Sequence, residues 1–167
     1  DESKSFSYET EGVHQGAYVK NLPTNPEVIP VYMTTAFNVE DLAELQQRYD
    51  AQGFCYNRNR NPNRSALAEL VSYAEGGEES VITGSGIAAI STTLLALLKS
   101  GDHVLADKTL YGETIDFLDQ ALIKYGITAT HVDFTNLDEV KAAIKGNTRI
   151  LYTETVSKIL VFPFIAA

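Results

Sequence analysis

Residues 81–89 read Val-Ile-Thr-Gly-Ser-Gly-Ile-Ala-Ala, and this stretch is the strongest local signal in the chain. The short apolar run from Ser80 to Thr83 predicts a strand, and the apolar residues from Gly86 to Leu98 predict a helix behind a glycine turn. The free amides and the positive dipole end of such a helix can hold a phosphate. The small residues of the turn would equally let a buried helix pack closely on a sheet. Both interpretations are open for this segment alone.

The glycine turn differs from the common nucleotide-binding loops. Ala89 stands where the dinucleotide fingerprint has its third glycine, and the lysine of a triphosphate-binding loop is absent. A ligand with a single phosphate therefore fits better. Ser85 lies outside a Gly-x-Ser-x-Gly elbow and has no evident general base, which argues against a serine nucleophile.

The sequence after Leu98 alternates between strand and helix patterns. Strands are predicted over residues 103–106, 127–132 and 149–153, with an amphipathic helix over 114–125 and a helix over 136–144 capped by Thr135. Strands separated in this way by helices need crossover connections. We therefore predict an α/β fold with a mostly parallel sheet and helices on both faces.

The N-terminal part of the chain has a different composition. Residues 1–30 are polar and interrupted by prolines, which predicts an extended N-terminal arm. A short helix is predicted over 39–49 with Asn38 as its cap, and another from Ser65 to a stop at Gly76 and Gly77. The predicted division is an arm with a short helix over 1–50, an α/β domain over 51–157 and an apolar tail over 158–167.

The composition limits the classes of partner. The 167 residues carry a formal net charge of -9, which argues against a surface that binds nucleic acid or an anionic membrane. The single cysteine permits no internal disulfide, and no signal-peptide pattern is visible. We expect a cytoplasmic protein with a small-molecule ligand.

A basic loop stands out in this acidic chain. Tyr56, Arg58, Arg60 and Arg64 lie close together in the sequence, and the planar fork of arginine suits a phosphate. The alternative is a solvated loop whose arginines pair with carboxylates. Tyr111 follows the predicted strand 103–106, where parallel sheets place ligands, although alone it could equally be a packing residue. His103 and His131 lack metal-ligand spacing and are expected to be structural.

Taken together, these segments resemble the Cys/Met-metabolism family of pyridoxal-phosphate-dependent enzymes, the group of the cystathionine lyases and synthases and methionine gamma-lyase. The resemblance runs from about residue 28 to residue 154 and rests on motifs in the family's order and spacing. They are 30–37 (Pro-Val-Tyr-Met-Thr-Thr-Ala-Phe), 56–62 (Tyr-Asn-Arg-Asn-Arg-Asn-Pro), 70–77 (Leu-Val-Ser-Tyr-Ala-Glu-Gly-Gly), 84–89 (Gly-Ser-Gly-Ile-Ala-Ala) and 111–114 (Tyr-Gly-Glu-Thr).

The resemblance implies the cofactor pyridoxal 5'-phosphate and a role for each motif. It places Ser85, Gly86 and Ile87 at the phosphate and stacks Tyr111, also a possible catalytic residue, on the pyridine ring. Ile87 replaces the family's methionine but keeps its backbone donor.

The basic loop of the family reaches a partner subunit. By the same resemblance Tyr56 and Arg58 would clamp the cofactor phosphate of that subunit in a homo-oligomer, a dimer or a tetramer. Arg60 and Asn63 replace the family's usual glycine and threonine. The implied activity is a carbon–sulfur lyase or transferase acting on a sulfur-containing amino acid, by elimination or replacement.

The end of the chain departs from the family pattern. After Ser157 the family continues with an Asp for the pyridinium nitrogen, a lysine that binds the cofactor covalently and an Arg for the substrate carboxylate, and residues 158–167 show none of these. Lys158 stands in the wrong context. We expect the N-terminal part of such an enzyme, shortened or frame-shifted, and inactive unless complemented. The alternatives are a non-catalytic subunit that binds a partner or the cofactor, and an unrelated nucleotide-binding α/β domain.

Overall fold

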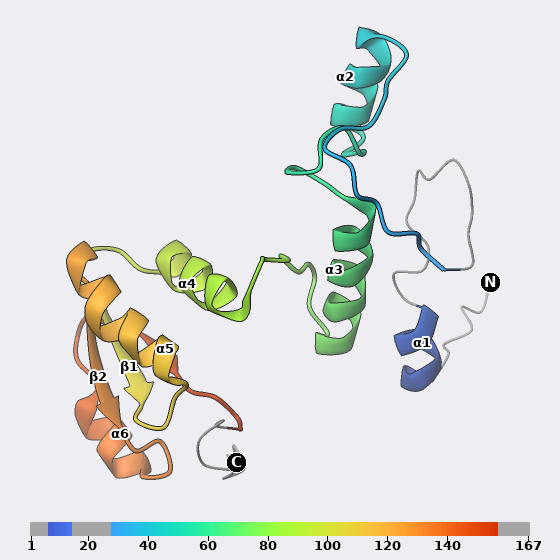
Figure 1. Cartoon of the computed structure of the whole chain (residues 1–167). Coiled ribbons are helices and arrows are strands. Elements are labelled where there is room, and N and C mark those ends of the chain that lie inside the picture. Colours follow the sequence, from blue (N-terminus) through green and yellow to red (C-terminus); the bar gives the residue numbers. More distant parts are fainter. Residues whose placement is uncertain (1–6, 15–27, 157–167) are drawn as a thin grey trace. The chain divides into compact units, whose positions relative to one another are not determined.

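The computed structural model describes residues 7–14 and 28–156. The chain divides into two compact units, Asp1–Ile82 and Thr83–Ala167, and Figure 1 shows the elements of each. Most of the predicted N-terminal arm and all of the predicted apolar tail lie outside the described residues. The prediction of an extended arm is wrong for residues 8–14, which form a helix. None of the helices in the described ranges is long and apolar enough to cross a membrane.

The second unit contains a parallel sheet of three strands. They are β1 (His103–Asp107), β2 (Thr128–Val132) and β3 (Thr148–Tyr152), in the order β2-β1-β3. All residues of β1 are buried because it is the middle strand and is covered on both faces. The three-strand sheet with its helices confirms the α/β fold class.

Helices cover opposite faces of this sheet. The first face packs against α4 (Gly86–Leu97) and the connection from β1 to β2, formed by α5 (Gly112–Asp116), a π-helical turn η1 (Phe117–Ala121) and a 3-10 turn η2 (Leu122–Tyr125). The second face packs against α6 (Leu137–Ala143), in the connection from β2 to β3. Val104 and Ala106 belong to the first cluster and Leu105 to the second, as the alternation of side chains along a strand requires.

The strand predicted over residues 80–83 is wrong. These residues form no ladder in the structure, and Val81 is 82% exposed. A strand is stabilised by hydrogen bonds to a neighbouring strand, and among the described residues the sheet contains only β1, β2 and β3. An apolar run favours a strand, but it does not show whether a neighbouring strand is available to pair with it.

Several helix boundaries differ from the predicted ones. α2 (Leu42–Asp50) is capped by Asp41 instead of Asn38, because the Asp41 carboxylate accepts the Glu44 amide at 2.8 Å. α6 is capped by Asn136, while the hydroxyl of Thr135 donates to Asp133. A pattern of apolar residues does not show which of two neighbouring polar side chains turns toward the helix.

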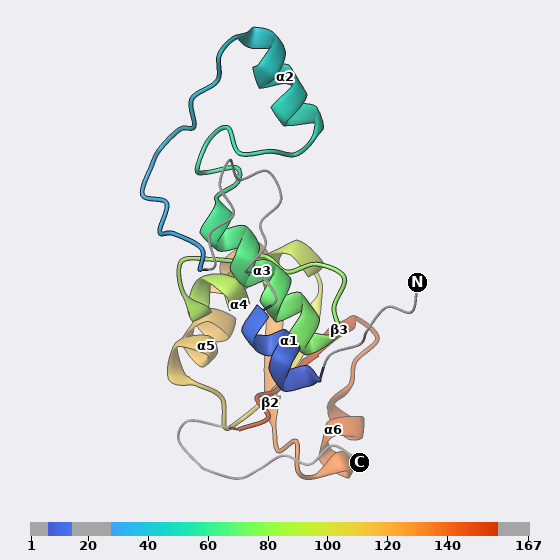
Figure 2. The ribbon, with the colours of Figure 1, turned by 90° about the vertical axis from the view of Figure 1, so that its right-hand side faces the viewer.

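α3 (Pro62–Glu75) begins three residues before the predicted start. Asn61 caps it, and Pro62 occupies the first position, where a missing N–H costs nothing. Its end at Gly76, with φ of 64°, is as predicted. Figure 2 shows α1 (Tyr8–His14) beside α3, where Tyr8 stacks on Tyr73 with ring centroids 6.1 Å apart.

The predicted helix over 114–125 is a helical path with three pitches, α5, η1 and η2. Its buried side is as predicted, since Leu118 and Leu122 are each 1% exposed. Gly126, with φ of 73°, ends the path and leads into β2.

Gly126→Ala is expected to lower the free energy of unfolding by about 1–3 kcal/mol. A Cβ there would strain the backbone and would lie 2.4 Å from the Ser100 hydroxyl. Gly146→Ala is the control, because a Cβ at Gly146 meets nothing within 4 Å. Urea denaturation followed by circular dichroism measures both variants. Equal stabilities would contradict the strain assigned to Gly126.

Candidate functional site

The glycine turn before α4 leaves two backbone donors open. Ser85, the N-cap, accepts the Ala88 amide on its hydroxyl oxygen at 3.2 Å, and its carbonyl accepts the Ala89 amide at 3.1 Å. The amides of Gly86 and Ile87 precede these and have no hydrogen-bond acceptor among the described residues. The turn therefore presents two adjacent N–H donors at the positive end of a twelve-residue helix.

The same turn is open to a ligand. Ser85 and Gly86 are exposed, and a Cβ added at Gly84 or Gly86 would meet nothing within 4 Å. These glycines therefore do not serve close packing of the helix within the described residues. This observation favours the phosphate interpretation of the turn over the packing interpretation.

Tyr111 lies at the carboxyl end of the sheet. It follows β1 as the residue before α5 and is 37% exposed. α5 contacts α4, so the element that Tyr111 begins lies against the helix that begins at the glycine turn.

The strand order explains why a ligand would bind here. The connection from β1 leads to β2 on one side, and the next strand, β3, pairs on the other side of β1. In parallel sheets, ligands bind in the crevice at such a change of direction, which here lies beyond the carboxyl ends of β1 and β3. Tyr111 follows β1 and Glu154 follows β3, and the Tyr111 amide donates to the Glu154 carboxylate at 3.3 Å.

Two residues that the sequence did not single out support the loop before Tyr111. Asp107, the last residue of β1, accepts the Thr109 amide and hydroxyl, each at 2.9 Å, and the Thr153 hydroxyl at 3.2 Å. Glu154 holds Tyr111 as described. Both acids lie at or just after the end of a strand, and this position is the feature of the sequence that could have identified them.

In the basic loop of the first unit, Arg58 and Tyr56 lie together. The Arg58 guanidinium carbon is 5.2 Å from the centre of the Tyr56 ring, a cation–π contact. Arg60 donates to the Gln52 side chain at 2.6 Å, and Arg64 donates to the carbonyls of Asn57 and Arg58. None of these arginines pairs with a carboxylate among the described residues. The predicted alternative of arginines neutralised by acids is therefore not what the described part of the chain shows.

The histidines of the sheet make structural contacts. His103 is fully buried between the hydroxyls of Thr130 and Thr148, and His131 lies 2.8 Å from the Asp119 carboxylate. Within residues 7–14 and 28–156, no cluster of three or more His, Cys, Asp and Glu side chains could hold a metal ion.

The comparison with protein families is decisive. The model of the family described as Cys/Met metabolism PLP-dependent enzyme matches residues 9–162. The chain belongs to this family. The cofactor of the family, pyridoxal 5'-phosphate, carries one phosphate on a planar ring, and the open amides at Gly86 and Ile87 suit such a phosphate. The match also excludes the alternative of an unrelated nucleotide-binding domain.

Relatives within the Cys/Met family are lyases named for sulfur-containing amino acids. The L-methionine gamma-lyase of Fusobacterium nucleatum subsp. polymorphum is 41% identical over 156 residues, which are 92% of this chain and 39% of the relative. The cystathionine beta-lyase MetC of Bacillus subtilis is 36% identical over 153 residues, 92% of this chain and 37% of the relative. The chain thus spans about two fifths of the length of these relatives.

Solved structures of the Cys/Met family share the fold. MetB from Corynebacterium glutamicum matches with a TM-score of 0.83 and 30% identity over 95% of this chain and 40% of that one. An O-acetylhomoserine (thiol)-lyase described as putative, from Campylobacter jejuni, matches with a TM-score of 0.78 and 32% identity over 92% and 38%. That structure contains a pyridoxyl-lysine phosphate. The matched part corresponds to the large domain of such enzymes, as the resemblance implied.

Proposed function

We propose that this chain supplies the phosphate and ring seat of a pyridoxal-phosphate-dependent carbon–sulfur lyase or transferase acting on a sulfur-containing amino acid. The observation that carries the proposal is the pair of open amides at Gly86 and Ile87, in the unit where Tyr111 follows the middle strand of the sheet. The names of the relatives support the substrate class.

Each residue of the seat has a distinct task. The amides of Gly86 and Ile87 donate to phosphate oxygens, and the Ser85 hydroxyl, whose oxygen accepts from Ala88, has its proton left to donate. The Tyr111 ring covers one face of the pyridine and restricts water there. Glu154 fixes the backbone of Tyr111. When bound, pyridoxal phosphate withdraws electrons from the amino acid substrate.

The covalent lysine of the family is not assigned to any described residue. Lys108 is the lysine that directly follows β1, but its ammonium lies 2.8 Å from the Asp133 carboxylate. The hydrogen bond and charge of Asp133 raise the pKa of Lys108, which keeps the amine protonated and a poor nucleophile. We therefore expect turnover only from an assembly that provides such a lysine.

The basic loop is proposed to act across subunits. Tyr56 and Arg58 would contact the cofactor phosphate of a partner subunit in a homo-oligomer. The Arg58 side chain is exposed, charged and without a carboxylate partner among the described residues. It is therefore available to bind a phosphate.

Equilibrium dialysis of the chain with pyridoxal 5'-phosphate and with pyridoxal tests the proposal. Because charge-assisted hydrogen bonds contribute about 1.5–3 kcal/mol each, the phosphate ester is expected to bind at least about tenfold more tightly than pyridoxal. Inorganic phosphate should compete, and adenosine monophosphate should compete more weakly than pyridoxal phosphate. Equal affinities for the two forms of the vitamin would overturn the proposed function.

A further inference from the structure

We propose that Arg64 and Asn63, at the start of α3, are positioning residues that hold Tyr56 and Arg58 in the geometry for a phosphate. This inference rests on the proposed function, because it assumes that the ligand of Tyr56 and Arg58 is the cofactor phosphate. It assigns different tasks to arginines that the sequence shows only as one basic cluster.

Arg64 supports the loop from the side of α3. The Tyr56 carbonyl accepts the amides of Asn59 and Arg60, at 3.0 and 3.1 Å. The next two carbonyls, those of Asn57 and Arg58, both accept from one terminal nitrogen of Arg64, the latter at 3.2 Å. The carbonyls of residues 56–58 are thus all satisfied, and Arg64 fixes the backbone that carries the Arg58 side chain.

Asn63 fixes the loop through a second segment, residues 30–37. Its side-chain amide donates to the Pro30 carbonyl and accepts the Tyr32 amide, both at 2.8 Å. A neighbouring parallel strand makes the same pair of bonds, to the carbonyl and the amide that flank one residue. The Asn63 amide therefore replaces one residue of a strand and anchors the start of the segment on α3.

The end of the same segment pairs with the loop itself. The Phe37 amide donates to the Cys55 carbonyl at 3.0 Å, and the Asn57 amide donates to the Thr35 carbonyl at 2.8 Å. These bonds enclose Tyr56, which forms an antiparallel bridge with Ala36. Tyr56 is thus held by the segment that Asn63 anchors, and the two residues that follow Tyr56 are held by Arg64.

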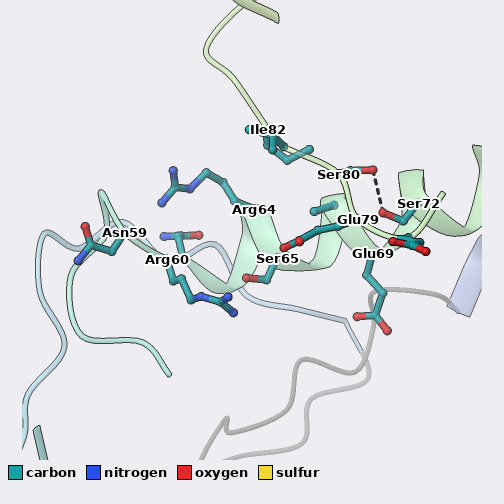
Figure 3. A pocket seen from close by; sticks show the side chains of 13 residues that line it. Asn59, Arg60, Arg64, Ser65, Glu69, Ser72, Glu79, Ser80 and Ile82 are labelled. Atoms are coloured by element: carbon teal, nitrogen blue, oxygen red, sulfur yellow. Dashed lines mark hydrogen bonds between the residues drawn. The ribbon is translucent and has the colours of Figure 1, made fainter. Parts of the chain in front are cut away.

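The contacts of the three arginines distinguish the one proposed to bind the phosphate, Arg58, from the two that bind protein groups, Arg60 and Arg64. Arg60 and Arg64 lie at one end of an open hollow of about 420 Å³ on α3, shown in Figure 3, and both donate to groups of the protein. Arg58 is exposed and stacks on Tyr56. Arg58 is thus the arginine of the three whose guanidinium donates to no protein group among the described residues, and we assign the anion to the pair of Tyr56 and Arg58.

A double-mutant cycle between Arg58 and Arg64 tests the inference, with the ratio of pyridoxal 5'-phosphate affinity to pyridoxal affinity as the readout. Arg64→Lys keeps the charge but cannot reach both carbonyls, so we expect a loss of about 3- to 10-fold in this ratio. Asn63→Ala, which removes both side-chain bonds, should lower it in the same direction. Arg60→Lys is the matched control in the same loop and should leave the ratio unchanged. Loss of structure would weaken the binding of both ligands equally and leave the ratio of their affinities unchanged.

The cycle distinguishes positioning from direct contact. In the Arg58→Ala background, Arg64→Lys should cause no further loss, because its effect passes through Arg58. An equal loss in both backgrounds, or no effect of Arg58→Ala on the ratio, would overturn the inference. The proposed function would still hold if the wild-type chain preferred the phosphate form. A wild-type chain without that preference would instead remove the proposed function.

Discussion

Replacing Gly86 with proline is expected to weaken the binding of pyridoxal 5'-phosphate by about 10- to 100-fold while α4 stays folded. Gly86 is the first helical residue, where proline is favoured because the helix does not use that N–H. Ser85 already has the extended conformation that a residue before proline needs, with φ of −163° and ψ of 164°. The substitution therefore removes one donor to the phosphate and little else.

Gly86→Ala is the matched control for this prediction. It keeps the amide, and a Cβ at this position meets nothing within 4 Å, so affinity for pyridoxal phosphate should stay within about threefold of the wild type. Equilibrium dialysis gives the affinities, and far-ultraviolet circular dichroism verifies that α4 is retained. A proline variant that is folded and binds as tightly as the alanine variant would show that the Gly86 amide does not contact the phosphate.

The second large effect is expected at His103, with His103→Ala lowering the free energy of unfolding by about 2–5 kcal/mol at pH 8. The imidazole is fully buried and joins all three strands, with Nδ1 at 2.8 Å from the Thr148 hydroxyl and Nε2 at 2.9 Å from the Thr130 hydroxyl. The Lys145 ammonium lies 3.2 Å from Nε2. Because an ammonium only donates, Nε2 accepts and the proton of the neutral ring lies on Nδ1.

The contribution of His103 should depend on pH. Burial, and after it the charge of Lys145, lowers the pKa of His103 below its ordinary value. The folded state then binds fewer protons than the unfolded state, so the stabilisation is complete above about pH 6.5 and is lost as the pH falls toward the lowered pKa. The wild type should lose stability from pH 8 to pH 5 more steeply than His103→Ala.

Urea denaturation at several pH values measures both parts of this prediction. His131→Ala is the control, because its ring pairs with Asp119 on a partly exposed side of the sheet, and it should cost about 1 kcal/mol or less. Equal costs for the two histidines, or parallel pH profiles for wild type and His103→Ala, would contradict the account of the buried imidazole.

The sequence predicted the elements that depend on local patterns. Periodicity located α4, β1, β2, β3 and the buried side of the path from α5 to η2, because side-chain spacing follows directly from backbone geometry. It failed at residues 80–83, since an apolar run does not contain the strand with which it must pair. It also missed the caps Asp41 and Asn136, which compete with polar neighbours one to three residues away.

The candidate site was predictable where it is local and unpredictable where it is assembled. The glycine turn and Tyr111 follow from motifs of a few residues. The bond between Glu154 and the Tyr111 amide joins residues 43 positions apart, and the bonds from Asn63 to the segment at Pro30 and Tyr32 span 33 and 31 positions. Such contacts are set by the order of strands and the course of loops, which one sequence does not display.

Amide NMR spectra of the nitrogen-15-labelled chain, recorded during titration with pyridoxal 5'-phosphate and with pyridoxal, would show which backbone amides contact the phosphate. We expect the amide signals of Gly86 and Ile87 to shift strongly with the phosphate ester and little with pyridoxal. Unchanged signals for both residues, with the phosphate-dependent shifts elsewhere in the chain, would contradict this expectation.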